Sequence, residues 1–184
     1  MKEVKRHTLA VLVDNEAGVL SRVVRLFSGK GYNIESLAVG TTERPDVSRI
    51  TIEVLADERQ ARLLSNQLRK LICVHSVKML ASERSIRREL VLIKVQAPDS
   101  EARNQVIQIA NIFRSSIIDV ALSSLTIAVI GDEGKIEAIQ KLLAEFGILE
   151  LVRTGMVALE RGQYTISEQT KEKGEFDYGK NVLG

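Results

Sequence analysis

The chain has 184 residues, of which 45% are hydrophobic and 27% are charged. This composition is typical of a folded globular protein and excludes an intrinsically disordered chain. The 26 basic and 24 acidic side chains give a net charge of +2, which excludes the strong positive field of many nucleic-acid binders. The longest apolar run, Leu9 to Val13, is too short to span a membrane. Because Cys73 is the single cysteine and no secretory leader pattern opens the sequence, we expect a cytoplasmic protein without an internal disulfide.

The first half of the chain alternates between β-branched apolar runs and segments in which apolar residues recur with helical spacing. Its clearest strand lies at residues 47–55, where Ile50, Ile52 and Val54 share one face and the intervening residues are polar. Asp57 is a good N-cap for the second helix. The predicted order is strand 6–13, a helix after Gly18, strand 32–40, strand 47–55, a helix after Asp57 and strand 72–80.

The second half repeats this order, which indicates an internal duplication. Asp57 corresponds to Asp132 and Val77 to Val152, both 75 residues further on. The predicted elements are strand 89–96, a helix from 98–100, strands 116–122 and 125–130, a helix after Asp132 and strand 148–159.

A βαββαβ unit folds as a four-stranded antiparallel sheet with two helices on one face, the ferredoxin-like arrangement. The sequence therefore predicts an α+β protein with two tandem ferredoxin-like domains, at residues 1–81 and 82–162, followed by a flexible tail at 163–184. The sheet face that lacks helices, or the sheet edge, is commonly covered by another domain or another subunit in so small a domain, and we therefore expect a homo-oligomer, specifically a homodimer.

Few residues suggest catalysis or metal binding. His7, Cys73 and His75 could approach one another on neighbouring strands, but no metal-ligand spacing accompanies them, and a buried cysteine with two strand histidines explains them better. The third strand lacks the aromatic side chains with which RNA-binding domains of the same element order stack bases, so we expect no nucleic-acid partner. We also expect no metal, no catalytic residue and no membrane partner.

The loop at residues 14–20 has features of a ligand site. The helix after Gly18 presents backbone N–H groups that would receive a carboxylate, and glycine allows a ligand to approach the backbone. Asn15 offers both a hydrogen-bond donor and an acceptor. A simple turn with helix capping remains the alternative.

Residues 6–20, from Arg6-His7-Thr8 to Gly18-Val19-Leu20, resemble the opening of an ACT domain, a small amino-acid-sensing module. Residues 26–37 and 48–52 are similar to the small regulatory subunit of acetolactate synthase, also called acetohydroxyacid synthase. The similarity continues through residues 87–95 and 117–120 and ends in Arg153-Thr154-Gly155 through Leu159, so it covers roughly residues 5–162.

The resemblance implies a non-catalytic chain whose larger partner subunit holds thiamine diphosphate, Mg²⁺ and FAD. That subunit condenses two pyruvates to acetolactate, or pyruvate with 2-oxobutyrate, in the synthesis of branched-chain amino acids such as valine and isoleucine. This chain itself is expected to need no cofactor. It would activate that catalytic subunit and confer feedback inhibition by valine. The resemblance also implies an effector site shared by two paired chains. Its residues would be Asn15, Gly18, Val19 and Leu20 of one chain with Asn33 and Ile34 of the partner chain.

Two other functions stay open at this point. One is a stand-alone ACT-type sensor that regulates another enzyme or a transcription factor, which would not need the second-half motifs. The other is a small enzyme or RNA binder built on the same scaffold.

Overall fold

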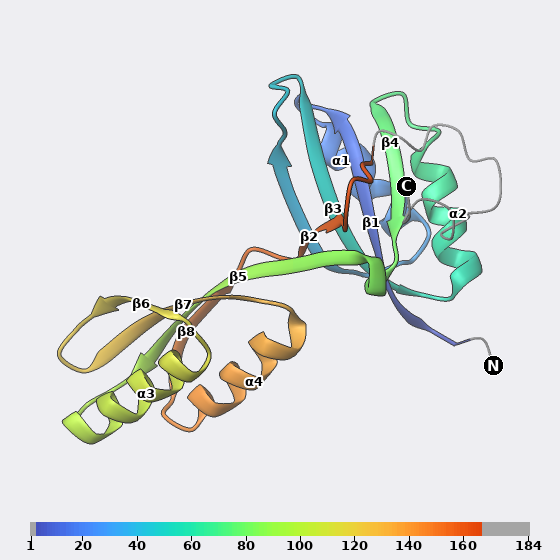
Figure 1. Ribbon diagram of the computed structural model, residues 1–184. Helices are drawn as coiled ribbons and strands as arrows, with labels where there is room; N and C mark the ends of the chain where they lie inside the picture. Colours follow the sequence, from blue (N-terminus) through green and yellow to red (C-terminus); the bar gives the residue numbers. More distant parts are fainter. Residues whose placement is uncertain (1–2, 167–184) are drawn as a thin grey trace, which may run out of the picture.

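The computed structural model describes residues 3–166, which form two sheet-and-helix units (Figure 1). Residues 167–184, most of the expected flexible tail, lie outside the described residues. The helices are α1 (Val19–Gly29), α2 (Glu58–Leu68), α3 (Ser100–Ile112) and α4 (Glu133–Ala144), with a short 3-10 turn η1 (Ser82–Arg84). The strands are β1 (Lys5–Asp14), β2 (Ile34–Thr41), β3 (Val47–Ala56), β4 (Val74–Leu80), β5 (Ser85–Gln96), β6 (Ser116–Val120), β7 (Ser124–Gly131), β8 (Ile148–Arg153) and β9 (Val157–Glu160).

The first unit is an antiparallel sheet in the order β2-β3-β1-β4, with α1 and α2 packed on one face. The predicted alternation along β3 is confirmed, because Ile50, Ile52 and Val54 belong to the core beneath the two helices. Phe27 of α1 and Leu64 of α2 close the same core and are almost fully buried.

The second unit has the strand order β6-β7-β5-β8, and α3 and α4 cover one of its faces. Val91, Ile93 and Val95 of β5 point into this second core. Both units therefore have the βαββαβ order, and the predicted α+β class with two ferredoxin-like sheets is confirmed.

The predicted helix starts at Asp57 and Asp132 are also confirmed. The Asp57 carboxylate accepts a hydrogen bond from the backbone N–H of Gln60, whose side chain in turn accepts from the backbone N–H of Asp57. This reciprocal capping box satisfies two of the backbone donors at the start of α2. Asp132 accepts from the backbone N–H of Lys135 in the same way.

The internal repeat is offset by one residue in its last strand. Val77 is buried and lies opposite Val11 of β1, whereas Val152 is 56% exposed and lies opposite Leu92 of β5. Leu151, one residue earlier, packs against the second core. Because successive strand residues point to opposite faces, the predicted equivalence of Val77 and Val152 is wrong by one position.

The last predicted strand, 148–159, is two strands. β8 ends at Arg153, the chain turns at Gly155 with a φ of 81°, and β9 then pairs with Ser85–Arg88 of β5. That pairing also explains why β5 begins at Ser85, four residues before the predicted start at residue 89. The chain around the expected domain boundary after residue 81 thus consists of the turn η1 followed directly by the first residues of β5.

The segment after Gly155 returns to the first unit and lies on the sheet face opposite α1 and α2 (Figure 1). Ala158 and Ile166 pack there against Ala10 of β1 and Leu80 of β4. Residues 163–166, expected as the start of the tail, belong to this cover, since the Ser76 hydroxyl donates to the Ile166 carbonyl at 2.8 Å. Part of the open sheet face is therefore covered by the same chain.

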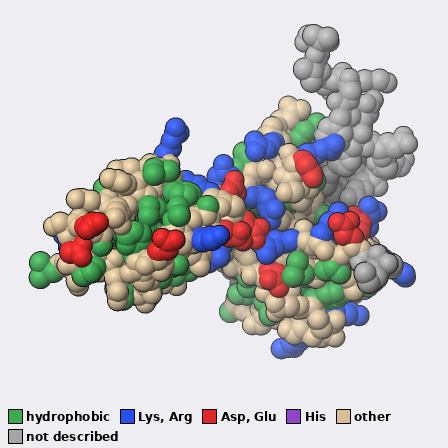
Figure 2. All heavy atoms as spheres, turned by 90° about the horizontal axis from the view of Figure 1, so that it is seen from below, with side chains coloured by type: hydrophobic (Ala, Val, Ile, Leu, Met, Phe, Trp, Pro, Cys, Tyr) green, Lys and Arg blue, Asp and Glu red, His purple; other side chains and the backbone are tan. Residues whose placement is uncertain are grey.

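Charged side chains gather where the two units meet (Figure 2). Glu53 of β3 is only 2% exposed, and its carboxylate accepts hydrogen bonds from Arg87 of β5 and, at 3.2 Å, from the Thr8 hydroxyl. Arg6 lies 3.7 Å from the same carboxylate and also pairs with Glu133 in the first turn of α4. The buried Glu53 charge is thus compensated by two arginines, one of which also contacts the second unit.

The turn at Gly155 generates a test of this arrangement. A Cβ at residue 155 would lie 2.9 Å from the Leu37 carbonyl oxygen, whereas one at Gly162 would meet only Tyr164 at 4.0 Å. Both glycines have positive φ, so alanine is strained at either site by about 1–2 kcal/mol. We expect Gly155→Ala to lower the free energy of unfolding by about 1–3 kcal/mol more than Gly162→Ala, because only the first also forces a clash. The free energy of unfolding of each variant can be measured by denaturant titration. An equal decrease in the two variants would contradict the observed packing of Gly155 on β2.

Candidate functional site

The N-terminus of α1 differs from the starts of the other helices. Asp57, Asp99 and Asp132 cap α2, α3 and α4, and each of these helices has an acidic residue in its first turn. At α1 the N-cap is Gly18, with a φ of 82°, no side chain among the described residues caps it, and its first turn has no acidic residue. Backbone N–H groups and the positive end of the helix dipole are therefore available to an external carboxylate.

The loop before Gly18 is held by the neighbouring β2–β3 loop. The Asn15 backbone N–H donates to the Asp46 carbonyl at 2.8 Å, and its side-chain amide donates to the Pro45 carbonyl at 2.8 Å. The Ser48 hydroxyl donates to the side-chain oxygen of Asn15 at 3.0 Å. Since an amide oxygen has two lone pairs, Asn15 keeps one acceptor site for a ligand. No local sequence pattern predicts that this loop anchors Asn15, although Pro45 is itself typical of a turn.

Charged neighbours of this loop are paired with one another. Asp14 lies 2.7 Å from His75 of β4. The Arg44 guanidinium donates to Asp46 and lowers the pKa of that carboxyl group. Both pairs are substantially exposed, so the hydrogen bonds of Asn15 contribute more to holding the loop than these ion pairs do.

The two apolar candidates at the start of α1 point in different directions. The Val19 side chain is 4% exposed and belongs to the first core, so only its backbone faces the loop. The Leu20 side chain is 39% exposed, and nothing lies within 4 Å of a Cβ built on Gly18. An apolar ligand group at this end of the helix would therefore contact Leu20.

Asn33 and Ile34 lie at the opposite end of the helix within one chain. They follow α1, which rises about 16 Å over its 11 residues. Ile34 pairs with Val54, whereas the Gly18 end of the sheet is marked by Thr41 and Ser48. The Asn33 amide donates to Glu35 at 2.8 Å, and Ile34 is partly buried against the core. The six predicted residues thus form two groups that a single chain does not bring together.

The residues considered for metal binding have other roles. Cys73 is a buried core residue, His75 pairs with Asp14, and His7 Nε2 lies 3.1 Å from the Ala56 carbonyl oxygen. Among residues 3–166, no group of three or more histidine, cysteine, aspartate or glutamate side chains has the arrangement of a metal site. No helix in this range is long and apolar enough to cross a membrane.

Comparisons with known proteins assign both halves of the chain. A family model described as an AHAS small subunit-like ACT domain matches residues 9–76, and one for the small subunit of acetolactate synthase matches residues 88–162. The acetolactate synthase small subunit of Mycobacterium bovis is 51% identical over 158 residues, covering 86% of this chain and 94% of that protein. The Aquifex aeolicus small subunit is 46% identical over 170 residues, covering 92% of this chain and 88% of its own length.

A solved structure agrees with these matches. The crystal structure of the acetolactate synthase small subunit from Thermotoga maritima superposes with a TM-score of 0.81 at 35% identity. It covers 87% of this chain and 99% of that one. Since the similarity spans both sheets, this chain belongs to the family of acetolactate synthase small subunits and is a regulatory, non-catalytic subunit.

Proposed function

We propose that two copies of this chain bind valine between them and thereby inhibit the catalytic subunit of acetolactate synthase, which the chain otherwise activates in the cytoplasm. The thiamine diphosphate, Mg²⁺ and FAD belong to that catalytic partner. The single observation that carries the effector site is the start of α1, where a positive-φ glycine leaves the helix without a side-chain cap. The match of residues 88–162 to the small-subunit family favours a subunit of acetolactate synthase over a stand-alone sensor that regulates a different enzyme.

The edge of the first sheet supports a homodimer. β2 is an edge strand, paired only with β3 among the described residues, and Val39 on it is 47% exposed. A free edge of this kind is a template for pairing with a second chain. If two β2 strands pair antiparallel about a two-fold axis, the Ile34 end of one strand meets the Thr41 end of the other. This pairing brings Asn33 and Ile34 of the partner to the Gly18 end, because Thr41 lies at that end of the sheet.

The residues that this pairing would bring together suit an apolar amino acid. The ligand carboxylate would accept hydrogen bonds from the N–H groups at the start of α1, and its ammonium would donate to the free acceptor site of Asn15. Leu20 of one chain and Ile34 of the other would contact the isopropyl group. Because one methylene changes binding by only about 1–3 kcal/mol, we expect leucine and isoleucine to compete weakly at the same place.

The first test is reconstitution. The purified chain alone should form no acetolactate from pyruvate, and adding it to its catalytic subunit should raise the rate. Valine should then lower the rate of the complex but not that of the catalytic subunit alone. A rate that is unchanged by this chain at saturating concentration would contradict the regulatory assignment to this partner.

Substitution at Gly18 tests the carboxylate site. In Gly18→Asp the new carboxylate would lie about 4 Å from that of valine, and at an effective dielectric near 20 the repulsion is about 4 kcal/mol, or about a thousandfold in affinity. Gly18→Asn is the matched control, because it has the same shape and tolerates positive φ but carries no charge. We expect activation to persist in both variants and valine inhibition to be lost mainly in Gly18→Asp. Equal losses in a valine titration would contradict the electrostatic explanation.

Mixed dimers test whether two chains share the site. In the proposed site the Asn33 side chain of the second chain would also hydrogen-bond to a charged group of valine, so Asn33→Ala should weaken valine binding roughly tenfold to hundredfold. In a dimer of one Gly18→Asp chain and one Asn33→Ala chain, one site would carry both changes and the other would be intact. Isothermal titration of such dimers, purified through two different tags, should recover one high-affinity site for each dimer. If Gly18 and Asn33 of the same chain formed each site, no intact site would return.

A further inference from the structure

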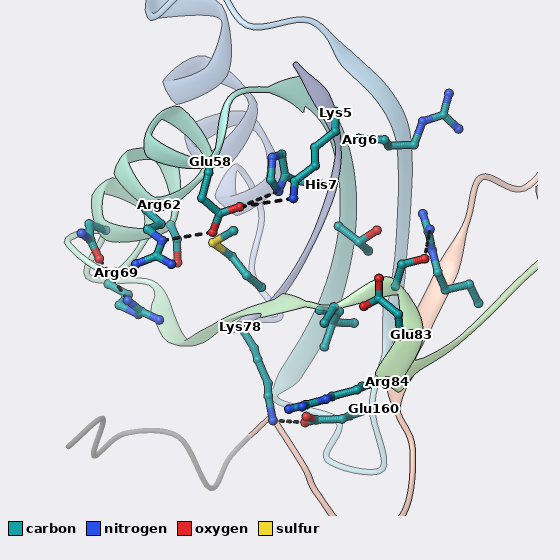
Figure 3. A pocket seen from close by; sticks show the side chains of 18 residues that line it. Lys5, Arg6, His7, Glu58, Arg62, Arg69, Lys78, Glu83, Arg84 and Glu160 are labelled. Atoms are coloured by element: carbon teal, nitrogen blue, oxygen red, sulfur yellow. Dashed lines mark hydrogen bonds and ion pairs between the residues drawn. The ribbon is translucent and has the colours of Figure 1, made fainter. Parts of the chain in front are cut away.

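A second candidate site lies on the first unit, at the sheet edge opposite β2. It is a cavity of about 640 Å³ between α2, the end of β4, the turn η1 and the first residues of β1 (Figure 3). Gly18 follows the other end of β1, and β4 is separated from β2 by the two central strands. Within one chain the cavity is therefore distinct from the proposed valine site, and its volume suits a small-molecule ligand.

More cationic than acidic side chains line the cavity, although two of the cations, Arg6 and Arg87, are paired with Glu53 and Glu133 outside the lining. The acidic residues that line it are Glu58, Glu83 and Glu160. The cationic residues that line it are Lys5, Arg6, Arg62, Arg69, Lys78, Arg84 and Arg87. A concave surface of one sign concentrates ligands of the opposite charge, so the cavity would attract an anion.

Two of the three carboxylates are already compensated by neighbouring cations. Glu58 accepts a hydrogen bond from Arg62 at 3.1 Å, and this contact lowers the pKa of the Glu58 carboxyl group. Glu160 pairs with Lys78 (Figure 3). Arg69 differs from these cations, because among residues 3–166 no carboxylate lies within ion-pair distance of it. Its guanidinium donates only to the Asn66 side chain and the Val77 carbonyl, each at 3.0 Å.

A buried hydroxyl gives an independent indication of a ligand. Ser65 lines the cavity from α2 and is 2% exposed, yet its Oγ has no hydrogen-bond partner among the described residues. Buried polar groups are nearly always hydrogen-bonded, since a buried polar group without a hydrogen-bond partner destabilises the folded protein. Arg62, Ser65 and Arg69 follow one another at spacings of three and four residues, so they lie along one face of α2. Ser65 thus lies between Arg62 and the C-cap residue Arg69 along this face of the helix.

We propose that this cavity binds a small phosphoryl-bearing anion through Arg69, Arg62 and the Ser65 hydroxyl. Guanidinium groups match the oxygens of a phosphoryl group in a bidentate manner, and a hydroxyl donates to a third oxygen. The volume leaves room for two adjacent phosphoryl groups, so pyrophosphate is the smallest suitable probe. This site would act on the ACT domain separately from valine.

Calorimetric titration of the full chain with pyrophosphate, at constant ionic strength and without phosphate buffer, tests the proposal. We expect Arg69→Gln to weaken binding at least tenfold, because a charge-assisted hydrogen bond is lost. Arg59→Gln is the matched control, since Arg59 is exposed on the same helix but does not line the cavity. If both variants weakened pyrophosphate binding equally, the binding would depend only on the overall charge of the protein and not on this cavity, which would contradict the proposal.

Ser65→Ala separates a ligand-binding hydroxyl from a structural one. We expect this variant to unfold at the same temperature as the native chain, or higher, without anion, because an unpaired buried hydroxyl is removed. It should also lose most of the rise in unfolding temperature that pyrophosphate produces in the native chain. A lower unfolding temperature together with an unchanged pyrophosphate effect would overturn the role of Ser65.

Citrate tests the phosphoryl class directly. As a tricarboxylate it shares the negative charge of pyrophosphate but not its phosphoryl oxygens. A guanidinium also pairs with carboxylates, but a planar carboxylate lacks the third oxygen that the Ser65 hydroxyl would bind, so we expect citrate to bind at least tenfold more weakly at the same ionic strength. Citrate binding as tight as that of pyrophosphate, or the absence of pyrophosphate binding, would overturn the proposal.

Discussion

The arrangement of the whole molecule depends on the strand pairing of β5. This strand runs for 12 residues, and its two ends pair with different partners: Ser85–Arg88 with β9, and Glu89–Gln96 with β7. β9 in turn lies on the open face of the first sheet, where the Arg49 guanidinium donates to the Ala158 carbonyl. The two units are therefore joined both by the chain and by a strand pair that is packed on the first sheet. A simple flexible linker would give neither contact.

Two buried carboxylates strengthen this junction. Glu53 on β3 is compensated by Arg87 of β5, and Glu89 of β5 is compensated by Arg153 of β8, whose Nε lies 3.0 Å away. The contact with Glu89 raises the pKa of Arg153 above its ordinary value, so the guanidinium stays charged. Removing one partner of a buried pair leaves an uncompensated charge, which destabilises a fold by about 3–5 kcal/mol. These pairs make the position of β5 specific, since a shifted register would separate Arg87 from Glu53 and Glu89 from Arg153.

Most of the local structure could be predicted from the sequence, because the apolar residues that each unit buries recur at the regular spacing of a strand or a helix. The alternation of Ile50, Ile52 and Val54 and the caps at Asp57 and Asp132 are local signals, and all are confirmed. The turn at Gly155 was missed because it depends on a contact with Leu37, 118 residues earlier in the chain, which no local pattern records. The division of the candidate site between two chains came from the family resemblance and not from any local pattern, and the strand register shows that Gly18 and Asn33 lie apart within one chain. The cavity at Ser65 depends on the packing of α2 beside β4, which no local pattern records either.

The two proposed sites differ in the source of their positive charge, and this difference suits their ligands. An amino acid at neutral pH carries one positive and one negative charge, so a cluster of arginines would repel its ammonium group while attracting its carboxylate. The start of α1 avoids this conflict, since it offers backbone N–H groups and a partial charge of about one half. Asn15 beside it accepts a hydrogen bond without adding charge. A phosphoryl anion carries no such positive group, and full guanidinium charges such as Arg62 and Arg69 are therefore the stronger ligands for it. Electrostatics alone thus favours the amino acid at one edge of the sheet and the anion at the other.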